Sequence, residues 1–353
     1  MTEAEAAVTE AEAAVTEAER AAAPAALQRL IGGFQISQAL HVTATLGIAD
    51  LLAAGPRPAD DLAAATGTHP RALYRLLRAV ASVGVLAEDG AGAFALTALG
   101  QFLRADHPRS VHGTAVFTGQ PTVWGTWQHL RHSVETGEPA FRHLHGVDRW
   151  TYLEQHPDVG ALFDKAMTSL ALRQRDAVVA GYDFSGARTV VDVGGGHGAQ
   201  LAAVLAAHPR ARGILFDQPH VVAGAAPVLR AAGVAERCAA VGGSFFEAVP
   251  DGGDVYLLSR VIHDWDDAQA TAILRTCRRA MSPAARLLLV ERVIAPGNTP
   301  DPTRFSDLTM LVMLGGQERT GAEFGALFAA AGLRLTRVLP TASGVSLLEG
   351  QPA

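Results

Sequence analysis

The chain has 353 residues, of which 49% are hydrophobic and 18% charged, and its formal net charge at pH 7 is −6. This length predicts two domains rather than one core, and the acidic balance argues against nucleic acid or an anionic membrane as partner. The N-terminus lacks the basic and apolar regions of a signal peptide, and no apolar run is long enough to span a bilayer. The two cysteines, Cys238 and Cys277, form no disulfide framework, so a reducing, cytoplasmic compartment is expected.

The first segment, residues 1–24, repeats the heptad TEAEAAV at 2–8 and 9–15. Only Val8 and Val15 are sizeable apolar residues there, so we expect a solvated tail, helix-prone or disordered, that ends at Pro24. A short intermolecular coiled coil is the alternative, although one valine per heptad makes a poor seam.

Residues 25–106 have a helical pattern with short breaks. An apolar helix starts near Leu27, helices follow over 46–55, 59–67 and 69–86, and a hairpin over 86–97 has Gly90 and Gly92 at its tip. Helices followed by a hairpin are the order of a winged-helix unit, which suggests DNA binding. The would-be recognition helix over 70–82 carries few positive charges, so we favour a winged-helix-like dimerisation or lid domain.

Residues 107–182 look helical and contain most of the large aromatic side chains. These are Phe117, Trp124, Trp127, Phe141, Trp150, Tyr152 and Phe163. Two interpretations stay open for this helical linker: a core that joins two domains, and a wall over a substrate pocket.

From residue 183 onward the pattern changes to short apolar strands that alternate with helices. Strands are expected at TVVDVG, GILFD, CAAVGG, DVYLLSR and RLLLVERV, and helices over 200–207, 221–232, 268–280 and 323–331. This order predicts an α/β fold with a doubly wound, Rossmann-like parallel sheet. The runs RLTRVLPT and VSLLEG, separated by a two-residue turn at Ser343–Gly344, should form an antiparallel pair at its edge.

The first strand of that sheet runs into a glycine turn, in the sequence VVDVGGGHG from Val190 to Gly198. Glycines such as Gly194 and Gly196 let main-chain N–H groups approach a ligand. Asp192 would repel a pyrophosphate but attract an ammonium group, and Asp217, at the end of the second strand, can accept ribose hydroxyls. An acid at both strand ends favours a cationic nucleoside without phosphates, namely S-adenosylmethionine. A turn cap for Asp192 and a helix cap for Asp217 are the structural alternatives.

The sequence SRVIHDWDD from Ser259 to Asp267 places His263 at the carboxyl end of the fourth strand, where doubly wound sheets bind ligands. A histidine there is a suitable general base for a phenol, and a carboxylate on its second ring nitrogen would hold the tautomer. Glu291 and Glu318 are the candidates for that carboxylate. The other histidines form no coherent ligand set, so no metal is expected.

At these residues the chain resembles the small-molecule O-methyltransferases that depend on S-adenosylmethionine, a family that includes plant caffeic acid enzymes and bacterial enzymes of polyketide and antibiotic biosynthesis. The resemblance runs from about Leu27 to the C-terminus. Its specific parts are VDVGGGHG, LFDQPHVV, RVIHDWDD, LLLVERVI and DLTMLVMLGGQERT. It implies a homodimer formed through the N-terminal domain, which also closes over the partner's substrate pocket.

The resemblance also implies roles for single residues. It makes His263 the base, flanked by Glu291 and Glu318. Cofactor contacts would come from Gly194, Gly196, Asp217, Ser244, Phe245, Ser259 and Trp265, beside Asp192 from the charge argument above. The acceptor pocket would be lined by Phe163, Met167, Met310 and Met313.

Two positions depart from the family pattern. Many members have aspartate where Ser244 stands, which weakens the expected adenine contact, and plant members have lysine where Ser259 stands, which favours the bacterial branch. The resulting expectation is a metal-independent O-methyltransferase acting on a phenolic secondary metabolite. A cofactor-binding homologue that hydroxylates or decarboxylates a polyketide is the first alternative, and a ligand-sensing winged-helix regulator is the second.

Overall fold

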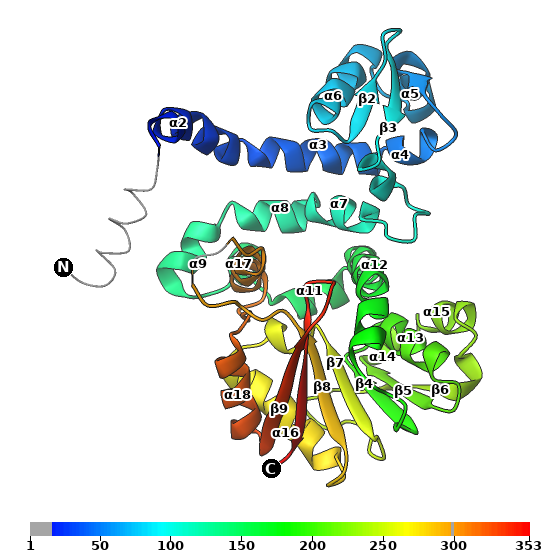
Figure 1. Ribbon diagram of the computed structural model, residues 1–353, viewed down its shortest axis with the longest axis vertical. Coiled ribbons are helices and arrows are strands. Elements are labelled where there is room, and N and C mark those ends of the chain that lie inside the picture. The colour runs from blue at the N-terminus through cyan, green and yellow to red at the C-terminus, as the bar shows by residue number, and fades with distance from the viewer. Residues whose placement is uncertain (1–15, 298–299) are drawn as a thin grey trace, which may run out of the picture. The chain divides into compact units, whose positions relative to one another are not determined.

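A computed structural model describes residues 16–297 and 300–353, so the repeated heptads lie outside the described residues. The chain divides into two compact units, Met1–Ala105 and Asp106–Ala353 (Figure 1). Each unit has its own secondary structure and is described by itself below. No helix among the described residues is both long and apolar enough to cross a membrane.

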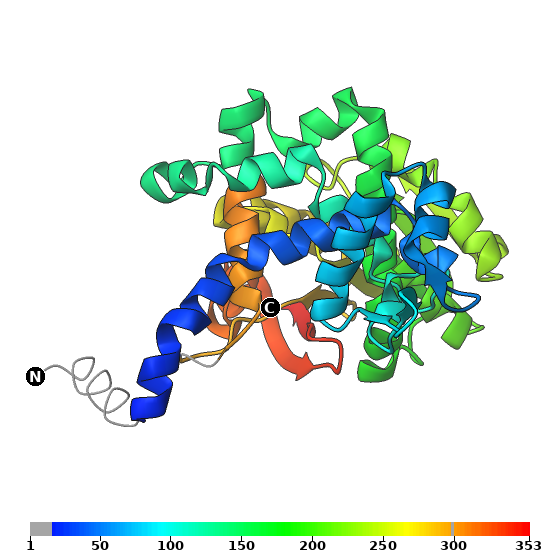
Figure 2. The same cartoon turned by 90° about the horizontal axis from the view of Figure 1, so that it is seen from above.

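The described part of the N-terminal unit starts with a helical arm, drawn in dark blue in Figure 2, and also contains a small sheet. Its elements are α2 (Glu17–Ile31), α3 (Gly33–Thr45), α4 (Ile48–Leu51), β1 (Arg57–Pro58), α5 (Ala59–Thr66), α6 (Pro70–Ser82), β2 (Leu86–Glu88), β3 (Ala93–Leu96) and η1 (Gly100–Leu103). The predicted hairpin is confirmed, since β2 and β3 pair antiparallel, and the unpredicted β1 adds to β3. Helix α6 is amphipathic and buries Leu73, Leu77 and Val80.

The helix-prone tail was expected to end at Pro24, and the structure does not place an end there. Helix α2 runs through Pro24. A proline inside a helix lacks one N–H donor and clashes with the carbonyl one turn earlier, so it weakens a helix without always ending it. Five alanines beside this proline, at 21–23 and 25–26, favour continuation because alanine has the highest helix propensity.

The C-terminal unit starts with a run of helices. These helices are α7 (His112–Thr118), α8 (Pro121–Trp127), α9 (Leu130–Thr136), α10 (Ala140–His145), α11 (Arg149–Gln155) and α12 (Pro157–Gly181). Helices α8 and α10 also contact α17 (Thr303–Met313), which comes from far along the chain. Buried Phe141 and Met313 belong to the apolar cluster that joins these helices.

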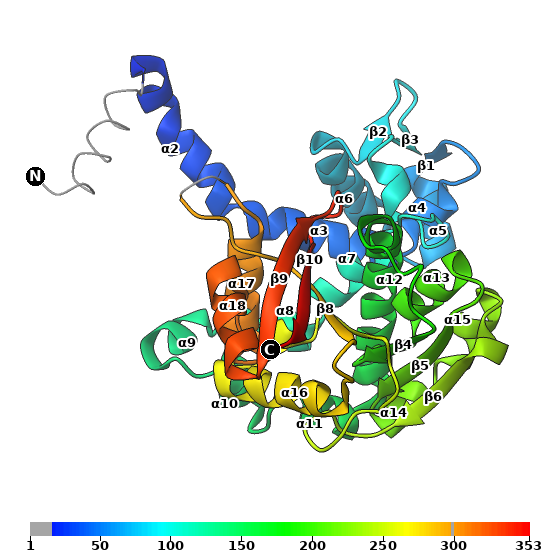
Figure 3. The same ribbon diagram turned by 60° about the horizontal axis from the view of Figure 1, so that its bottom comes forward.

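The sheet of this unit has seven strands in the order β6-β5-β4-β7-β8-β10-β9 (Figure 3). The strands are β4 (Thr189–Val193), β5 (Arg212–Asp217), β6 (Cys238–Gly242), β7 (Val255–Ser259), β8 (Arg286–Glu291), β9 (Leu333–Pro340) and β10 (Ser346–Pro352). Strands β4 to β8 pair in parallel, whereas β10 pairs antiparallel with both β8 and β9. The predicted Rossmann-like sheet with an antiparallel edge is therefore confirmed.

Helices pack on both faces of the sheet. One face is covered by α16 (Asp267–Ala280) and α18 (Gly321–Ala330), and the other by α13 (Ala199–Ala207) and the end of α12. The segment predicted as one helix over 221–232 is instead two short helices, α14 (Pro219–Val222) and α15 (Ala226–Ala231). Residues 223–225 separate the two helices, and a Cβ at Gly224 would lie 2.6 Å from His197 Nε2, so the ring leaves no room for a side chain there.

Candidate active site

The glycine turn after β4 is held by main-chain bonds to the neighbouring strand. Gly194 has φ +70°, and its N–H donates to the Phe216 carbonyl at 2.8 Å. A Cβ at Gly194 would lie 2.8 Å from Val261 Cγ2, so both conformation and space require glycine. Gly196 also has positive φ, but no atom lies within 4 Å of its Cβ position. The main chain is therefore open to a close approach at Gly196.

Two acidic residues lie beneath and beside this turn. Asp192 is fully buried, and neither of its carboxylate oxygens has a hydrogen-bond partner among the described residues. Burial, with the nearby Asp217, raises the pKa of Asp192 to about 7. Asp217 accepts the N–H of Gly196 at 2.8 Å and that of Gln218 at 2.7 Å, one on each oxygen. A carboxylate has about four acceptor sites, so Asp217 can still bind two hydroxyl groups.

The other predicted cofactor residues lie along the same edge of the sheet. Ser259 ends β7, and the Ser244 hydroxyl accepts the N–H of Phe246 at 3.3 Å. The Phe245 ring lies beside Gly194 and meets the Trp265 ring edge-on, with centroids 5.8 Å apart. This edge thus combines aromatic rings with the glycine turn, as a site for a nucleoside requires.

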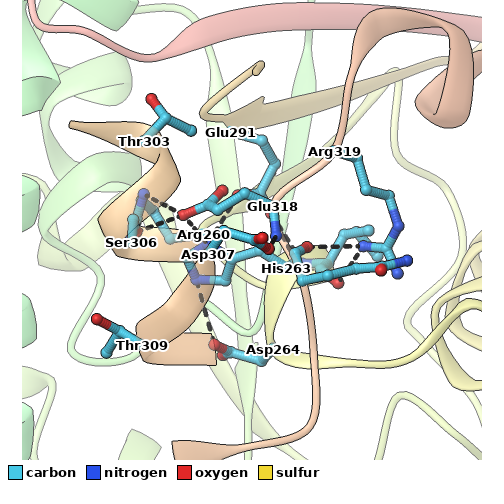
Figure 4. A network of polar contacts seen from close by, with 12 residues as sticks. Arg260, His263, Asp264, Glu291, Thr303, Ser306, Asp307, Thr309, Glu318 and Arg319 are labelled. Carbon is cyan, nitrogen blue, oxygen red and sulfur yellow. Dashed lines mark hydrogen bonds and ion pairs between the residues drawn. The ribbon is translucent and has the colours of Figure 1, made fainter. Parts of the chain in front are cut away.

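His263 lies in η3 (Ile262–Asp264), directly after β7, with 3% of its surface exposed (Figure 4). Its Nδ1 faces two carboxylates, at 3.4 Å from Glu291 Oε2 and 3.3 Å from Glu318 Oε1. Its Nε2 lies 3.2 Å from Asp264 Oδ1. Both predicted glutamates therefore contact the same ring nitrogen, and the other nitrogen faces a carboxylate that sequence reasoning did not single out.

Glu291 is the last residue of β8 and has no exposed surface. Its Oε1 accepts the main-chain N–H groups of Val261, Ile262 and His263 at 3.0, 2.8 and 3.4 Å. The same carboxylate therefore holds the loop and orients the imidazole. Burial raises the pKa of Glu291, while the His263 charge opposes that rise.

Glu318 is held from several sides in the loop after α17. Its Oε1 accepts the Ser306 hydroxyl at 2.6 Å, and its N–H donates to Asp307 Oδ1 at 2.9 Å. Arg260 Nη1 lies 3.8 Å from the same oxygen. Burial alone would raise the pKa of Glu318, but the contacts with His263, Arg260 and Ser306 outweigh it and lower that pKa.

The charges around His263 set its protonation. Burial and the Arg260 charge lower the pKa of the imidazole, but Glu291 and Asp264 outweigh them and raise it to about 10. Arg260 is also the one non-glycine residue with positive φ, +58°, in the described part of the chain. Such strain persists only where the surroundings enforce it, and it is common at functional sites.

Arg319 and Gly316 fix the loop that carries the base. Arg319 is fully buried and donates to the Ile262 and Trp265 carbonyls at 3.2 and 2.9 Å and to Asp267 Oδ1. A Cβ on Gly316 would collide with the main chain of His263 and Asp264. The segment GGQERT thus supplies the Glu318 carboxylate, the Arg319 donors that hold the base loop and a glycine that lets the two main chains approach closely.

The predicted acceptor residues lie in two places. Phe163 packs on Phe117 and Trp150, with centroids 5.8 Å apart in each pair, and Trp150 stacks on Trp265 at 6.0 Å. Met310 and Met313 are buried on α17. Met167, by contrast, is 36% exposed on α12. Phe163 is therefore linked to the base loop through two tryptophans.

His263, Glu291 and Glu318 are also close enough to hold a metal, with one ligand atom of each within 4.8 Å of the others. The imidazole atom at that point is Nδ1, which already faces both carboxylates. A metal needs an unprotonated nitrogen, whereas an Nδ1 that donates its proton to Glu318 cannot bind one. The donor set thus fits a hydrogen-bonded imidazole better than a metal centre.

Comparisons with known proteins identify the family. A family model for the O-methyltransferase domain matches residues 127–334, and one for the O-methyltransferase dimerisation domain matches residues 28–106. The chain belongs to the O-methyltransferase family. The family expected from the sequence is confirmed.

Among similar proteins is a phenazine O-methyltransferase of Lysobacter antibioticus, 47% identical over 92% of this chain and 95% of its own length. The crystal structure of LaPhzM matches with a TM-score of 0.90 and 46% identity, over 94% of this chain and 99% of that one. The O-methyltransferase NcsB1 was solved with S-adenosylmethionine and 2-hydroxy-5-methyl naphthoic acid. It matches at 37% identity and a TM-score of 0.76, over 90% of this chain and 96% of that one.

Proposed function

We propose that this O-methyltransferase uses S-adenosylmethionine to methylate a phenolic hydroxyl of an aromatic secondary metabolite, with His263 as general base. The observation that carries the assignment is a buried imidazole, held by Glu291 and Glu318, on the sheet edge that also carries the glycine turn. Similar proteins act on phenazine and naphthoate compounds by name, which supports an aromatic acceptor.

Residues at the glycine turn fit this cofactor. Asp192 offers a carboxylate without a hydrogen-bond partner beneath the turn, suited to an ammonium group, and Asp217 retains acceptor sites for ribose hydroxyls. Gly194 and Gly196 leave room for the methionine part, and Ser244, Phe245, Ser259 and Trp265 would surround the adenosine. When bound, the cofactor supplies a methyl group already activated on a sulfonium sulfur.

The protein's own task is then to position the hydroxyl and remove its proton. A phenol has a pKa of about 10. The surroundings of His263 raise its pKa, which makes the neutral imidazole a stronger base toward a phenol. Nε2 would take the phenolic proton as the methyl group passes from sulfur to the oxygen, with the carbon–sulfur bond breaking and S-adenosylhomocysteine left behind. Glu291 and Glu318 stabilise the imidazolium from the Nδ1 side.

The acceptor pocket is assigned to Phe163, Met167, Met310 and Met313. Substitution there should change which phenols are accepted more than it changes cofactor binding. The division into a tail (1–24), a winged-helix-like dimerisation domain (25–106), a helical linker and pocket wall (107–182) and a catalytic domain (183–353) is proposed with it. The free cysteines Cys238 and Cys277 support a cytoplasmic location.

A homodimer formed through the N-terminal unit is part of the proposal. The match to the dimerisation domain supports it, as do apolar side chains exposed along α2 and α3, such as Leu30 at 77% and Phe34 at 56%. Light scattering should give twice the chain mass. Replacing Leu30 and Phe34 by serine together should shift the protein toward the monomer.

Release of S-adenosylhomocysteine tests the reaction. The purified protein is mixed with S-adenosylmethionine and a panel of phenols and hydroxyquinones, in excess EDTA. Turnover with any of them supports a metal-independent methyltransferase. One relative, 35% identical, carries the name aclacinomycin 10-hydroxylase. Cofactor binding with a hydroxylated product and no S-adenosylhomocysteine would therefore assign the altered chemistry instead.

A further inference from the structure

Arg149 is a buried cation in the helical wall of the C-terminal unit. It is the first residue of α11, and only 5% of its surface is exposed. Three phenylalanine rings surround its guanidinium, whose central carbon lies 5.4, 5.6 and 5.1 Å from the centroids of Phe117, Phe141 and Phe163. Such contacts stabilise a cation, but they satisfy none of its five N–H donors in the guanidinium plane.

The guanidinium has no anionic partner in contact. Within the described parts of the chain, its nitrogens make no hydrogen bond and no ion pair. The adjacent Asp148 does not pair with it, because that carboxylate caps α11 by accepting the N–H groups of Trp150 and Thr151 at 3.0 Å each. Burial lowers the pKa of Arg149 to about 10, and the charge of Asp264 opposes that effect.

Asp264 links this cation to the reacting end of the site. Its carboxylate lies 3.2 Å from His263 Nε2, the nitrogen that must meet the acceptor hydroxyl. The next residue of α11, Trp150, stacks on Trp265, two residues beyond the base. Arg149 therefore lies in the same wall as the predicted acceptor residue Phe163, and within electrostatic reach of the group beside the base.

We propose that Arg149 binds a carboxylate of the acceptor, so that the protein methylates hydroxylated aromatic acids. This inference rests on the proposed methyl transfer at His263. A guanidinium fork matches a carboxylate with two parallel hydrogen bonds, and a buried, otherwise unpaired cation gains most from an anionic ligand. Phe117 and Phe163, which are only partly buried, would pack on the aromatic body of the acceptor while its hydroxyl reaches Nε2. Asp264 disfavours an anion beside Nε2, which directs the carboxylate toward Arg149.

The test compares matched ligands. Binding of hydroxybenzoic and hydroxynaphthoic acids, and of their methyl esters, is measured by calorimetry on the full chain saturated with S-adenosylhomocysteine. The acids should bind roughly 10- to 100-fold more tightly than the esters, the range expected for a charge-assisted pair. Equal binding, or no binding by any acid, overturns the proposal.

Variants locate the effect. In Arg149→Gln the ratio of acid to ester affinity should fall close to one, and Arg149→Lys should give an intermediate ratio because the charge remains without the fork. Arg142→Gln, on the exposed side of α10, removes the same charge and should keep the wild-type ratio. If Arg149→Gln does not fold, the ratios of acid to ester affinity in the wild-type protein and in Arg149→Lys still test the proposal. A full ratio in Arg149→Gln or in Arg149→Lys overturns the proposal.

Turnover separates this inference from the methyl transfer itself. If the protein methylates neutral phenols and shows no preference for acids, only the proposed role of Arg149 is overturned. If acids bind tightly but no S-adenosylhomocysteine is released from S-adenosylmethionine, the proposed methyl transfer is overturned and the carboxylate site is retained.

Discussion

The two halves of the site, the glycine turn and the histidine loop, each contain a fully buried carboxylate, but these carboxylates are partnered differently. Glu291 accepts three main-chain N–H groups and lies against His263. Asp192 has no hydrogen-bond partner among the described residues. The difference supports the proposal that the protein organises the histidine loop by itself, whereas the glycine turn is completed by a cationic ligand.

Loss of the base should have the largest effect. His263→Ala should lower kcat by roughly 10²- to 10⁴-fold, the usual contribution of a positioned base. Cofactor affinity, measured by calorimetry, should be nearly unchanged because the glycine turn lies in the other half of the site. Full activity in this variant would sink the assignment of the base.

The clamp of the histidine loop comes next. Arg319→Gln leaves the carbonyls of Ile262 and Trp265 without their donor, so the free energy of unfolding should fall by about 2–5 kcal/mol. Denaturant titration measures this, with Arg275→Gln as a control, since Arg275 donates to a carbonyl at an exposed position. Equal losses in the two variants would contradict a special role for the clamp.

In the glycine-turn half, a substitution should raise the free energy of unfolding rather than lower it. The folded pKa of Asp192, about 7, lies above its ordinary value of 3.8, so the folded protein loses stability as pH rises between these values. Asp192→Asn removes that loss and should raise the unfolding free energy at pH 8 by about 1–3 kcal/mol without cofactor.

The same change should weaken S-adenosylmethionine binding, because the ammonium group loses its counter-charge. Thermal melts with and without cofactor measure both effects. A variant that is less stable at pH 8, or that binds the cofactor as tightly as the native protein, would contradict the comparison of the two halves.

The smallest effect is a pair of opposite shifts in the pH profile. Activity should rise with pH as His263 loses its proton, up to its pKa of about 10. Asp264 raises that pKa and Arg260 lowers it, so Asp264→Asn should move the rising limb of kcat/KM to lower pH and Arg260→Gln to higher pH, each by roughly one unit. Shifts in the same direction would show that these charges do not set the protonation of the base.

Much of this architecture follows from local patterns in the chain. Alternating apolar strands and helices predict the parallel sheet, since each strand buries both faces. The glycine turn and His263 follow strands, so both lie at the carboxyl edge of the sheet, where ligands bind. The details of helix boundaries were less accessible, as the passage of α2 through Pro24 and the break at Gly224 show.

The sequence by itself determined the family and a parallel sheet with an antiparallel edge, and it proposed His263 as the base, because these depend on short motifs and on periodicity. Only the tertiary structure decided which charges meet. Glu291 and Glu318 reach one nitrogen of His263 from separate segments, Arg319 clamps the loop from behind, and Arg149 is buried among three rings. These contacts join residues far apart in the chain, and spacing along a sequence carries no information on distances across a packed core.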